Sequence, residues 1–231
     1  MDERYIHPGV SPRSLGEEAY QLLRDQILSG RLAPDERLRF RQLADQFDIG
    51  IAALREALNR LISERLVILE PQRGFRVAPA SIAELRDISN LRIELSLAAL
   101  ESSIRLGGED WETEIVASLH RLARAALPKA ASDVAAADAW EERHEAFHGS
   151  LIAACDSPWR LHFCAALSSQ FQRYRRLIIL RMGRSEQTAS RVEDEHKAIA
   201  AATIGRDVAQ ASKFPREHFE WSRDYFRKNF R

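Results

Sequence analysis

The chain has 231 residues, 45% of them hydrophobic, which is enough for two packed cores. Lysine plus arginine and aspartate plus glutamate both number 34, so any surface that binds nucleic acid must be a local patch. The sequence has no run of about 18 apolar residues and its N-terminus is polar, which predicts a cytoplasmic protein without membrane contact. Cys155 and Cys164 are too few for a disulfide scaffold and are expected to be buried free thiols.

The first part of the chain carries the pattern of a helix-turn-helix. Apolar residues recur at helical spacing over residues 14–29, and a turn around Pro34 leads into a short helix expected over Phe40–Phe47. A tight connection at residues 48–50 precedes a third helix, expected over residues 52–64. Two helices joined by a few residues that include glycine are typical of the helix-turn-helix motif.

A β-hairpin is expected next, over residues 66–78. The segments L-V-I-L-E and F-R-V-A-P favour strands, and P-Q-R-G between them supplies a turn. This hairpin would be the wing of a winged helix-turn-helix domain over residues 1–79, and Gly74 in its turn would allow a close approach to DNA.

Everything beyond this border has helical periodicity, so a second, all-α domain is predicted over residues 80–231. Its helices are expected at residues 81–106, 110–126, 132–155, 157–181, 185–204 and 206–230. Pro215 is expected to kink or restart the last of them. The long apolar face of the first suits an antiparallel helical bundle. The predicted fold is therefore mostly α, with an N-terminal winged helix-turn-helix and a C-terminal helical bundle.

Arginines gather on three adjacent elements of the first domain. In a helix-turn-helix the second helix lies in the major groove with its N-terminal residues toward the bases, which places Arg55 near base edges. Arg41, at the start of the preceding helix, and Arg37 and Arg39 just before it are expected to reach phosphates. Arg73 and Arg76 flank the wing turn, and Arg73 is the DNA-binding candidate there. Each alone has the alternative of an ordinary solvated side chain, but their convergence favours DNA binding.

The segment L-R-F-R-Q-L-A-D-Q-F-D-I-G-I-A-A-L-R-E-A-L-N-R-L, followed by L-V-I-L-E-P-Q-R-G-F-R-V, resembles the winged helix of the GntR superfamily. By that resemblance Arg41, Arg55 and Gly74 take the family's DNA-contact positions. The departure is I-A-A at residues 51–53, where the family usually has arginine or a small residue, then serine or threonine, then proline. Without that cation, hydroxyl and proline, operator affinity or specificity is expected to be altered.

Four histidines of the second domain can meet inside the bundle. His144 and His148 are four residues apart, so both imidazoles project from one face of their helix, as two ligands of one metal ion must. His196 and His218 fall on two later helices, which a bundle can bring to the same interior point. The ordinary alternative for each is a surface or hydrogen-bonded core residue.

The segment H-E-A-F-H also has the form of the H-E-x-x-H motif of zinc metalloproteases, with Glu145 as the general base. The metzincin extension of that motif requires a glycine and a third histidine, but the chain has Leu151 and Ala154 at those positions. A zinc-dependent hydrolase is therefore only an alternative. A helical interaction module that no longer reads DNA is another.

The second domain resembles the FCD ligand-binding domain of the FadR subfamily. His148 matches the histidine of its D-x-x-F-H motif, His144 occupies the aspartate position, and His196 and His218 match two later histidines. The resemblance implies a divalent metal site, and the all-nitrogen set favours zinc or nickel, with loss of metal binding as the other outcome. Phrases such as R-H-E-A-F-H and A-A-C-D-S-P-W-R-L resemble the CsiR or GlaR branch, repressors of glutarate and 4-aminobutyrate catabolism.

These resemblances imply a ligand-responsive repressor of a carboxylate or dicarboxylate catabolic operon, and not an enzyme. A homodimer would bind an inverted repeat in operator DNA. A small carboxylate effector, such as a dicarboxylate, would contact the metal and an arginine clamp and release the DNA. Arg92 is the first candidate for effector binding and Tyr174 the second; for each, a salt bridge or interhelical packing is the alternative.

Overall fold

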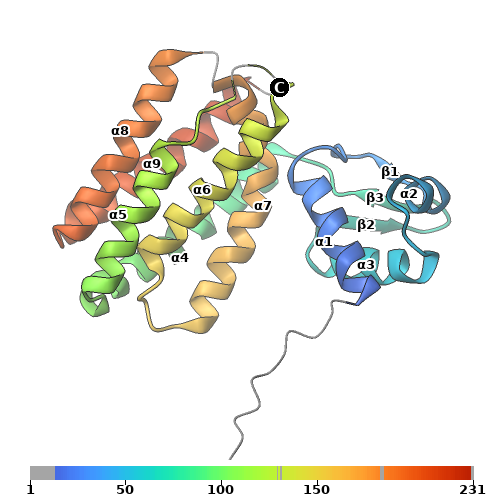
Figure 1. The fold of residues 1–231 in the computed structure, drawn as a ribbon, viewed down its shortest axis with the longest axis horizontal. Helices are drawn as coiled ribbons and strands as arrows, with labels where there is room; N and C mark the ends of the chain where they lie inside the picture. Colours follow the sequence, from blue (N-terminus) through green and yellow to red (C-terminus); the bar gives the residue numbers. More distant parts are fainter. Residues whose placement is uncertain (1–13, 129, 131, 183–184, 230–231) are drawn as a thin grey trace, which may run out of the picture. The chain divides into compact units, whose positions relative to one another are not determined.

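The structure, a computed structural model, describes residues 14–128, 130, 132–182 and 185–229. The start of the first predicted domain, residues 1–13, and the end of the second, residues 230–231, lie outside these ranges. Contacts divide the described residues into two compact units, the first within residues 14–27 and 31–79 and the second within residues 28–30 and 80–229 (Figure 1). The predicted fold class is confirmed: in the described residues, strands occur in the first unit and the second is helical. None of the described helices combines the length and apolar character needed to cross a membrane.

The helix-turn-helix of the first unit consists of α2 (Phe40–Phe47) and α3 (Ile51–Ser63), preceded by α1 (Leu15–Leu28). Asp48 closes α2 in the left-handed conformation, with φ of 52°, and Gly50 is the N-cap of α3. The buried face of α3 is the apolar stripe that the periodicity predicted: Leu54, Ala57, Leu58 and Leu61. These side chains hold α3 against the core, so its opposite face is left exposed.

The wing is a three-stranded antiparallel sheet in the order β1-β3-β2. Strands β2 (Val67–Glu70) and β3 (Gly74–Val77) form the predicted hairpin. Strand β1 (Arg37–Leu38), which the sequence analysis assigned to a turn, pairs with Arg76 and Phe75 of β3. A two-residue strand is too short to show alternation, so only pairing with the hairpin defines it.

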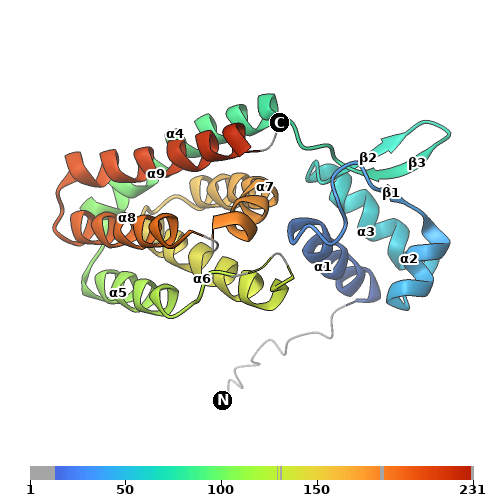
Figure 2. The same ribbon diagram turned by 90° about the horizontal axis from the view of Figure 1, so that it is seen from above.

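The second unit contains six helices in its described residues: α4 (Ile82–Leu106), α5 (Glu109–Ala123), α6 (Val134–Ile152), α7 (Pro158–Met182), α8 (Glu186–Ile204) and α9 (Val208–Asn229). Helix α4 packs against α7 and α9, and α5 packs against α6 and α8. Figure 2 shows α9 alongside α4, with α8 between α9 and α5. The core that these helices share is rich in aromatic residues, among them Trp111, Trp140, Phe147, Phe171 and Tyr174.

Two local predictions have different outcomes. Helix α9 passes through Pro215 as one helix, so the predicted restart does not occur. Pro215, His218 and Phe219 are all buried, and their packing compensates for the backbone hydrogen bond that a proline cannot donate. Cys155 and Cys164 are buried free thiols, as predicted.

Candidate functional site

The arginines predicted to contact DNA are exposed on α2, α3 and the wing. Arg55 lies on α3, with its guanidinium carbon 5.6 Å from the centre of the Phe40 ring. The others lie on β1, at the N-cap and first turn of α2, and in the wing turn: Arg37, Arg39, Arg41 and Arg73. In the part of the chain that the structure describes, none of these five forms an ion pair with a carboxylate. Their charges are therefore available to a partner.

Arg76, which was predicted to flank the wing turn on the DNA side, has a different environment. Its guanidinium is 2.8 Å from a carboxylate oxygen of Asp35 and 2.6 Å from one of Glu70. These two ion pairs tie β3 to β2 and to the turn before β1. Gly74 at the start of β3 has a φ of 82°, and a Cβ there would meet no atom within 4 Å. A glycine is favoured here because the backbone adopts a positive φ, and not because a side chain would clash. The space around the tip of the wing is open.

The departure at residues 51–53 gives α3 an apolar first turn. Ile51 is 46% exposed, Ala52 is also exposed, and no side chain caps this end of the helix. An exposed isoleucine can contact the methyl group of thymine but cannot donate a hydrogen bond to a base. Arg55, one turn further along α3, is the first exposed side chain of this helix that can donate a hydrogen bond.

The four predicted histidines come together in the second unit. His144 and His148 project from α6, His196 from α8 and His218 from α9, and all four are buried. One possible ligand atom from each lies within 4.8 Å of the others. The ring centres of His144 and His148 are 4.4 Å apart, and those of His196 and His218 are 4.8 Å apart. This arrangement can hold a metal ion.

The electrostatics keep these imidazoles neutral. Burial lowers the pKa of His144, His148 and His196 well below the ordinary value, and the neighbouring histidines and Arg175 lower it further. Burial also lowers the pKa of His218, against the opposing effect of Glu195. Neutral imidazole is the form of histidine that binds a metal ion.

Three nitrogens of the cluster have no hydrogen-bond partner among the described residues: Nδ1 of His144, Nε2 of His148 and Nε2 of His196. A buried polar atom without a partner is costly, and a metal ion is one of the partners that such atoms take. His218 differs, because its Nδ1 lies 2.8 Å from a carboxylate oxygen of Glu195. A carboxylate in this position orients a metal-ligating imidazole.

The lowered pKa values predict an acid-sensitive metal-free protein. Below a pH of about 6.5, a histidine of the unfolded chain is protonated, whereas the buried histidine of the folded protein stays neutral. As the pH falls further, the free energy of unfolding therefore decreases by about 1.4 kcal/mol per pH unit for each such histidine. The charged groups around the cluster are Arg92 on α4, Glu141 and Glu145 on α6, Arg175 on α7 and Glu195 on α8.

Urea unfolding of chelator-treated protein between pH 7.5 and 5.5 measures this slope in a range above ordinary carboxylate titration. Replacement of His196 by glutamine should make the slope shallower, whereas replacement of the exposed His162 should not. Identical slopes for the unchanged protein and both variants would contradict the prediction.

A buried ion-pair network lies beside the histidines. Nε of Arg175 on α7 donates a 2.8 Å hydrogen bond to Glu141, and the same guanidinium pairs with Glu145. The hydroxyl of Ser168 lies 2.8 and 2.9 Å from the two carboxylate oxygens of Glu145. Burial opposes the ionisation of Glu145, but Arg175, Arg92 and the Ser168 hydrogen bond outweigh it and lower the pKa.

Of these three residues, only Glu145 was singled out from the sequence; Glu141 and Arg175 were not predicted. The available signal was the four-residue spacing of Glu141 and Glu145, which places both carboxylates on one helical face, as for His144 and His148. The partner could not be found in this way, because Arg175 lies on a different helix and many arginines compete for the role.

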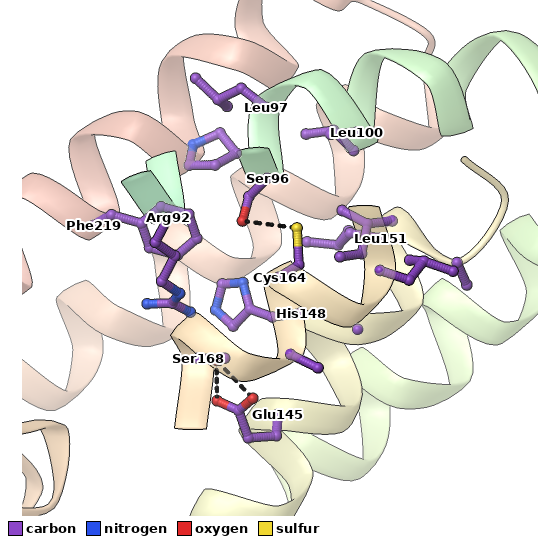
Figure 3. Close-up of a pocket in the computed structure, with 16 residues that line it drawn as sticks. Arg92, Ser96, Leu97, Leu100, Glu145, His148, Leu151, Cys164, Ser168 and Phe219 are labelled. Carbon is purple, nitrogen blue, oxygen red and sulfur yellow. Dashed lines mark hydrogen bonds between the residues drawn. The ribbon is translucent and has the colours of Figure 1, made fainter. Parts of the chain in front are cut away.

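A cavity of about 400 Å³ adjoins the histidines (Figure 3). His148, Glu145 and Arg92 line it together with apolar side chains. Arg92 is 4% exposed, and its guanidinium carbon lies 4.1 Å from the ring centre of Phe219. Arg92 has no carboxylate at ion-pair distance among the described residues. Burial and the charge of Arg175 lower the pKa of Arg92 to about 10, so it stays charged at neutral pH.

Tyr174, the second candidate for effector binding, lies away from this cavity. Its hydroxyl donates a 2.5 Å hydrogen bond to Glu84 and accepts one from the backbone N–H of Ser81. Its ring packs against Phe226. Burial and the bond to Glu84 raise its pKa. Tyr174 therefore anchors the start of α4, and the effector contact predicted for it is not made in this cavity.

Comparison with known families accounts for most of the chain. Residues 15–77 match the family described as bacterial regulatory proteins, gntR family, and residues 87–220 match the FCD domain. The chain is a GntR-family transcriptional regulator with an FCD domain. The resemblances found in the helix-turn-helix and histidine motifs are confirmed.

Two similar proteins span nearly the whole regulator. The HTH-type transcriptional regulator BphR of Paraburkholderia xenovorans (strain LB400) is 35% identical over 215 residues, which is 93% of this chain and 86% of BphR. The HTH-type transcriptional repressor GlaR of Escherichia coli (strain K12) is 34% identical over 201 residues, which is 87% of this chain and 90% of GlaR.

Solved structures share the fold of this regulator. The McbR/YncC protein of E. coli has a TM-score of 0.78 at 20% identity, and a GntR regulator from Rhodococcus sp. RHA1 has a TM-score of 0.74 at 17% identity. Each comparison covers 95% of this chain and 100% of the other. At these identities the likeness concerns the fold alone.

Membership of this family decides between the classes left open by the sequence. The relatives are transcriptional regulators, so H-E-A-F-H is not the motif of a peptidase here and the regulator is not an enzyme. The environment of Glu145 agrees, since a carboxylate paired with Arg175 and with a lowered pKa is a poor proton acceptor.

Proposed function

We propose that this regulator is a repressor whose FCD domain holds zinc or nickel and binds a small carboxylate effector, which releases operator DNA. The observation that carries the proposal is a buried set of four neutral imidazoles beside a cavity that contains Arg92. The related GlaR is named a transcriptional repressor, which supports repression of transcription by this regulator as well.

The donor set supports the choice of metal. Four imidazoles offer nitrogen only, which suits zinc or nickel and disfavours magnesium and calcium, since these cations prefer oxygen ligands. His144, His148, His196 and His218 would be the ligands, and Glu195 would orient His218. When bound, the metal would supply a positive centre that attracts an effector oxygen.

The cavity residues support a carboxylate effector. Arg92 is a buried cation without a carboxylate partner among the described residues, and paired hydrogen bonds from a guanidinium suit a carboxylate. His148 lines the same cavity, so an effector carboxylate held by Arg92 would lie close to the metal ligands. Glu145, which also lines the cavity, is paired with Arg175, so the effector would supply the carboxylate partner of Arg92.

The DNA side of the proposal places α3 in the major groove, with Arg55 toward a guanine. Phosphate contacts would come from the exposed arginines Arg37, Arg39, Arg41 and Arg73, and Gly74 would let the wing approach the backbone. A homodimer would present two such surfaces to an inverted repeat. An effector that binds better to the non-binding arrangement of the dimer would shift the population and relieve repression.

The test of DNA reading is the substitution Arg55→Ala. It should weaken binding to an operator selected from random DNA about 10- to 100-fold and flatten the preference at one base position, because a bidentate contact with guanine is lost. The control is Arg65→Ala, at an exposed arginine beyond the opposite end of α3.

Fluorescence anisotropy on the selected operator and on scrambled DNA measures both effects, and circular dichroism checks that each variant is folded. Arg41→Ala should instead weaken binding to all DNA equally and reduce its salt dependence. Unchanged sequence preference in Arg55→Ala would count against α3 as the recognition helix.

A further inference from the structure

The charges that line the FCD cavity are unevenly distributed. Arg92 is the single cation among the lining residues that the structure describes, and Glu145 is the single anion. Glu145 already has partners in Arg175 and Ser168. Arg92 and the metal proposed for the histidines both lie at the end of the cavity that His148 lines. A carboxylate at that end is therefore neutralised, whereas one at the opposite end meets no lining cation.

The rest of the cavity is apolar. Leu97 and Leu100 of α4 and Leu151 of α6 line it, and Figure 3 shows Leu97 and Leu100 well separated from the guanidinium of Arg92. The polar atoms nearby are the hydroxyl of Ser96 and the thiol of Cys164, which lie 4.0 Å apart. Neither carries a positive charge, so this end of the cavity suits hydrocarbon.

We infer that the effector is a monocarboxylate with an apolar aliphatic or aromatic body, and not the dicarboxylate expected from the sequence. The inference rests on the proposed function, because it takes the same cavity and the same anchor, Arg92. A second carboxylate would lie against leucine side chains without a counter-charge, and burying an unpaired charge is strongly unfavourable.

Pairs of acids that differ by one carboxylate test this on the full-length, zinc-loaded protein. Isothermal titration calorimetry with pentanoate against glutarate, and with benzoate against terephthalate, compares a methyl group or hydrogen with a second carboxylate. The monocarboxylate of at least one pair should bind at least about 100-fold more tightly than its partner. Equal or tighter binding of the dicarboxylate in each pair would overturn the inference while leaving the carboxylate site intact.

The variant Arg92→Gln separates this failure from failure of the proposed function. It should weaken binding of either class about 10- to 100-fold, because the charged hydrogen bonds are lost. Two results would show that the effector site is misplaced: no acid binds the unchanged protein, or Arg92→Gln binds the acids as tightly as the unchanged protein does. Either result would also overturn the inference of a monocarboxylate effector.

A cation placed at the apolar end should reverse the preference. Leu97 is half-buried, so Leu97→Arg can keep part of its side chain solvated. We expect this variant to bind glutarate about tenfold or more tightly than the unchanged protein does, and pentanoate less tightly. Ala98→Arg, at the adjacent exposed position of α4, is the control and should change neither affinity. If the affinity for glutarate rises in both variants, or in neither, the assignment of Leu97 to an apolar end of the cavity is contradicted.

Discussion

Removal of zinc or nickel with a chelator should lower the free energy of unfolding of the regulator by about 4 kcal/mol, if the free metal was about 1,000 times its dissociation constant. The reason is the state of the four histidines. Nitrogens of His144, His148 and His196 are buried without a hydrogen-bond partner in the described residues. A metal bound to the folded state alone removes that cost. Thermal unfolding before and after chelation, with metal content determined by mass spectrometry, measures the effect.

Substitutions distinguish metal ligation from simple packing. His196→Gln should abolish stoichiometric zinc binding and the response to chelator, whereas the exposed His162→Gln should retain both. Cobalt absorption spectra of the two variants report ligation directly, which a purely structural histidine would not alter. A chelator response equal in both variants would contradict the assignment.

The identity of residue 144 offers a second readout. His144→Asp supplies an oxygen ligand where the FCD motif has aspartate, so it should raise the affinity for manganese relative to zinc. An unchanged ratio of the two affinities would mean that His144 does not ligate the metal.

Replacement of Arg175 by methionine should cost about 3–5 kcal/mol of stability, because it leaves Glu141 as a buried charge without its partner. Arg175 is 5% exposed and Glu141 3% exposed, and the two are joined at 2.8 Å. Burial raises the pKa of Glu141 even with Arg175 present, so the loss of Arg175 should favour its protonated form. Urea unfolding at pH 7 measures the loss.

The double substitution Glu141→Leu with Arg175→Met should recover much of that stability, since the fully buried charge of Glu141 is removed. Glu145 also loses Arg175, but it is 34% exposed and keeps its hydrogen bond from Ser168. The control is Arg121→Met, which breaks an exposed pair with Glu114, both side chains being more than half exposed; it should cost at most about 1 kcal/mol. If Arg175→Met and Arg121→Met lower the free energy of unfolding by the same amount, the prediction that the buried ion pair matters more than an exposed one is contradicted.

The helices were predictable because their signals are local. Apolar residues at helical spacing and glycine or proline at the ends depend on neighbours a few residues away, and the predicted α2, Phe40–Phe47, agrees with the structure. Strand β1 was missed because its evidence lies on β3, far along the chain. The restart at Pro215 was predicted from a local penalty that tertiary packing outweighs.

The histidine cluster was partly predictable for the same reason. The spacing of His144 and His148 places both on one face of α6 without any knowledge of the fold. The residues on other helices followed from the resemblance to the FCD motif. The contrast between Arg92 and Tyr174, both proposed for the effector, could not be made, because each lies on a long helix and only packing decides which one faces the cavity.

Sequence alone was sufficient to determine the helix-turn-helix, the hairpin wing, the helical second domain and the four histidines as a candidate set. These features rest on periodicity, spacing and motif, which short stretches of chain express. Tertiary structure decided which groups are buried together: Arg175 with Glu141 and Glu145, and Arg92 with an apolar cavity wall. Charge burial depends on what surrounds a group in three dimensions, so its consequences for the metal and the effector emerge only once the helices are packed.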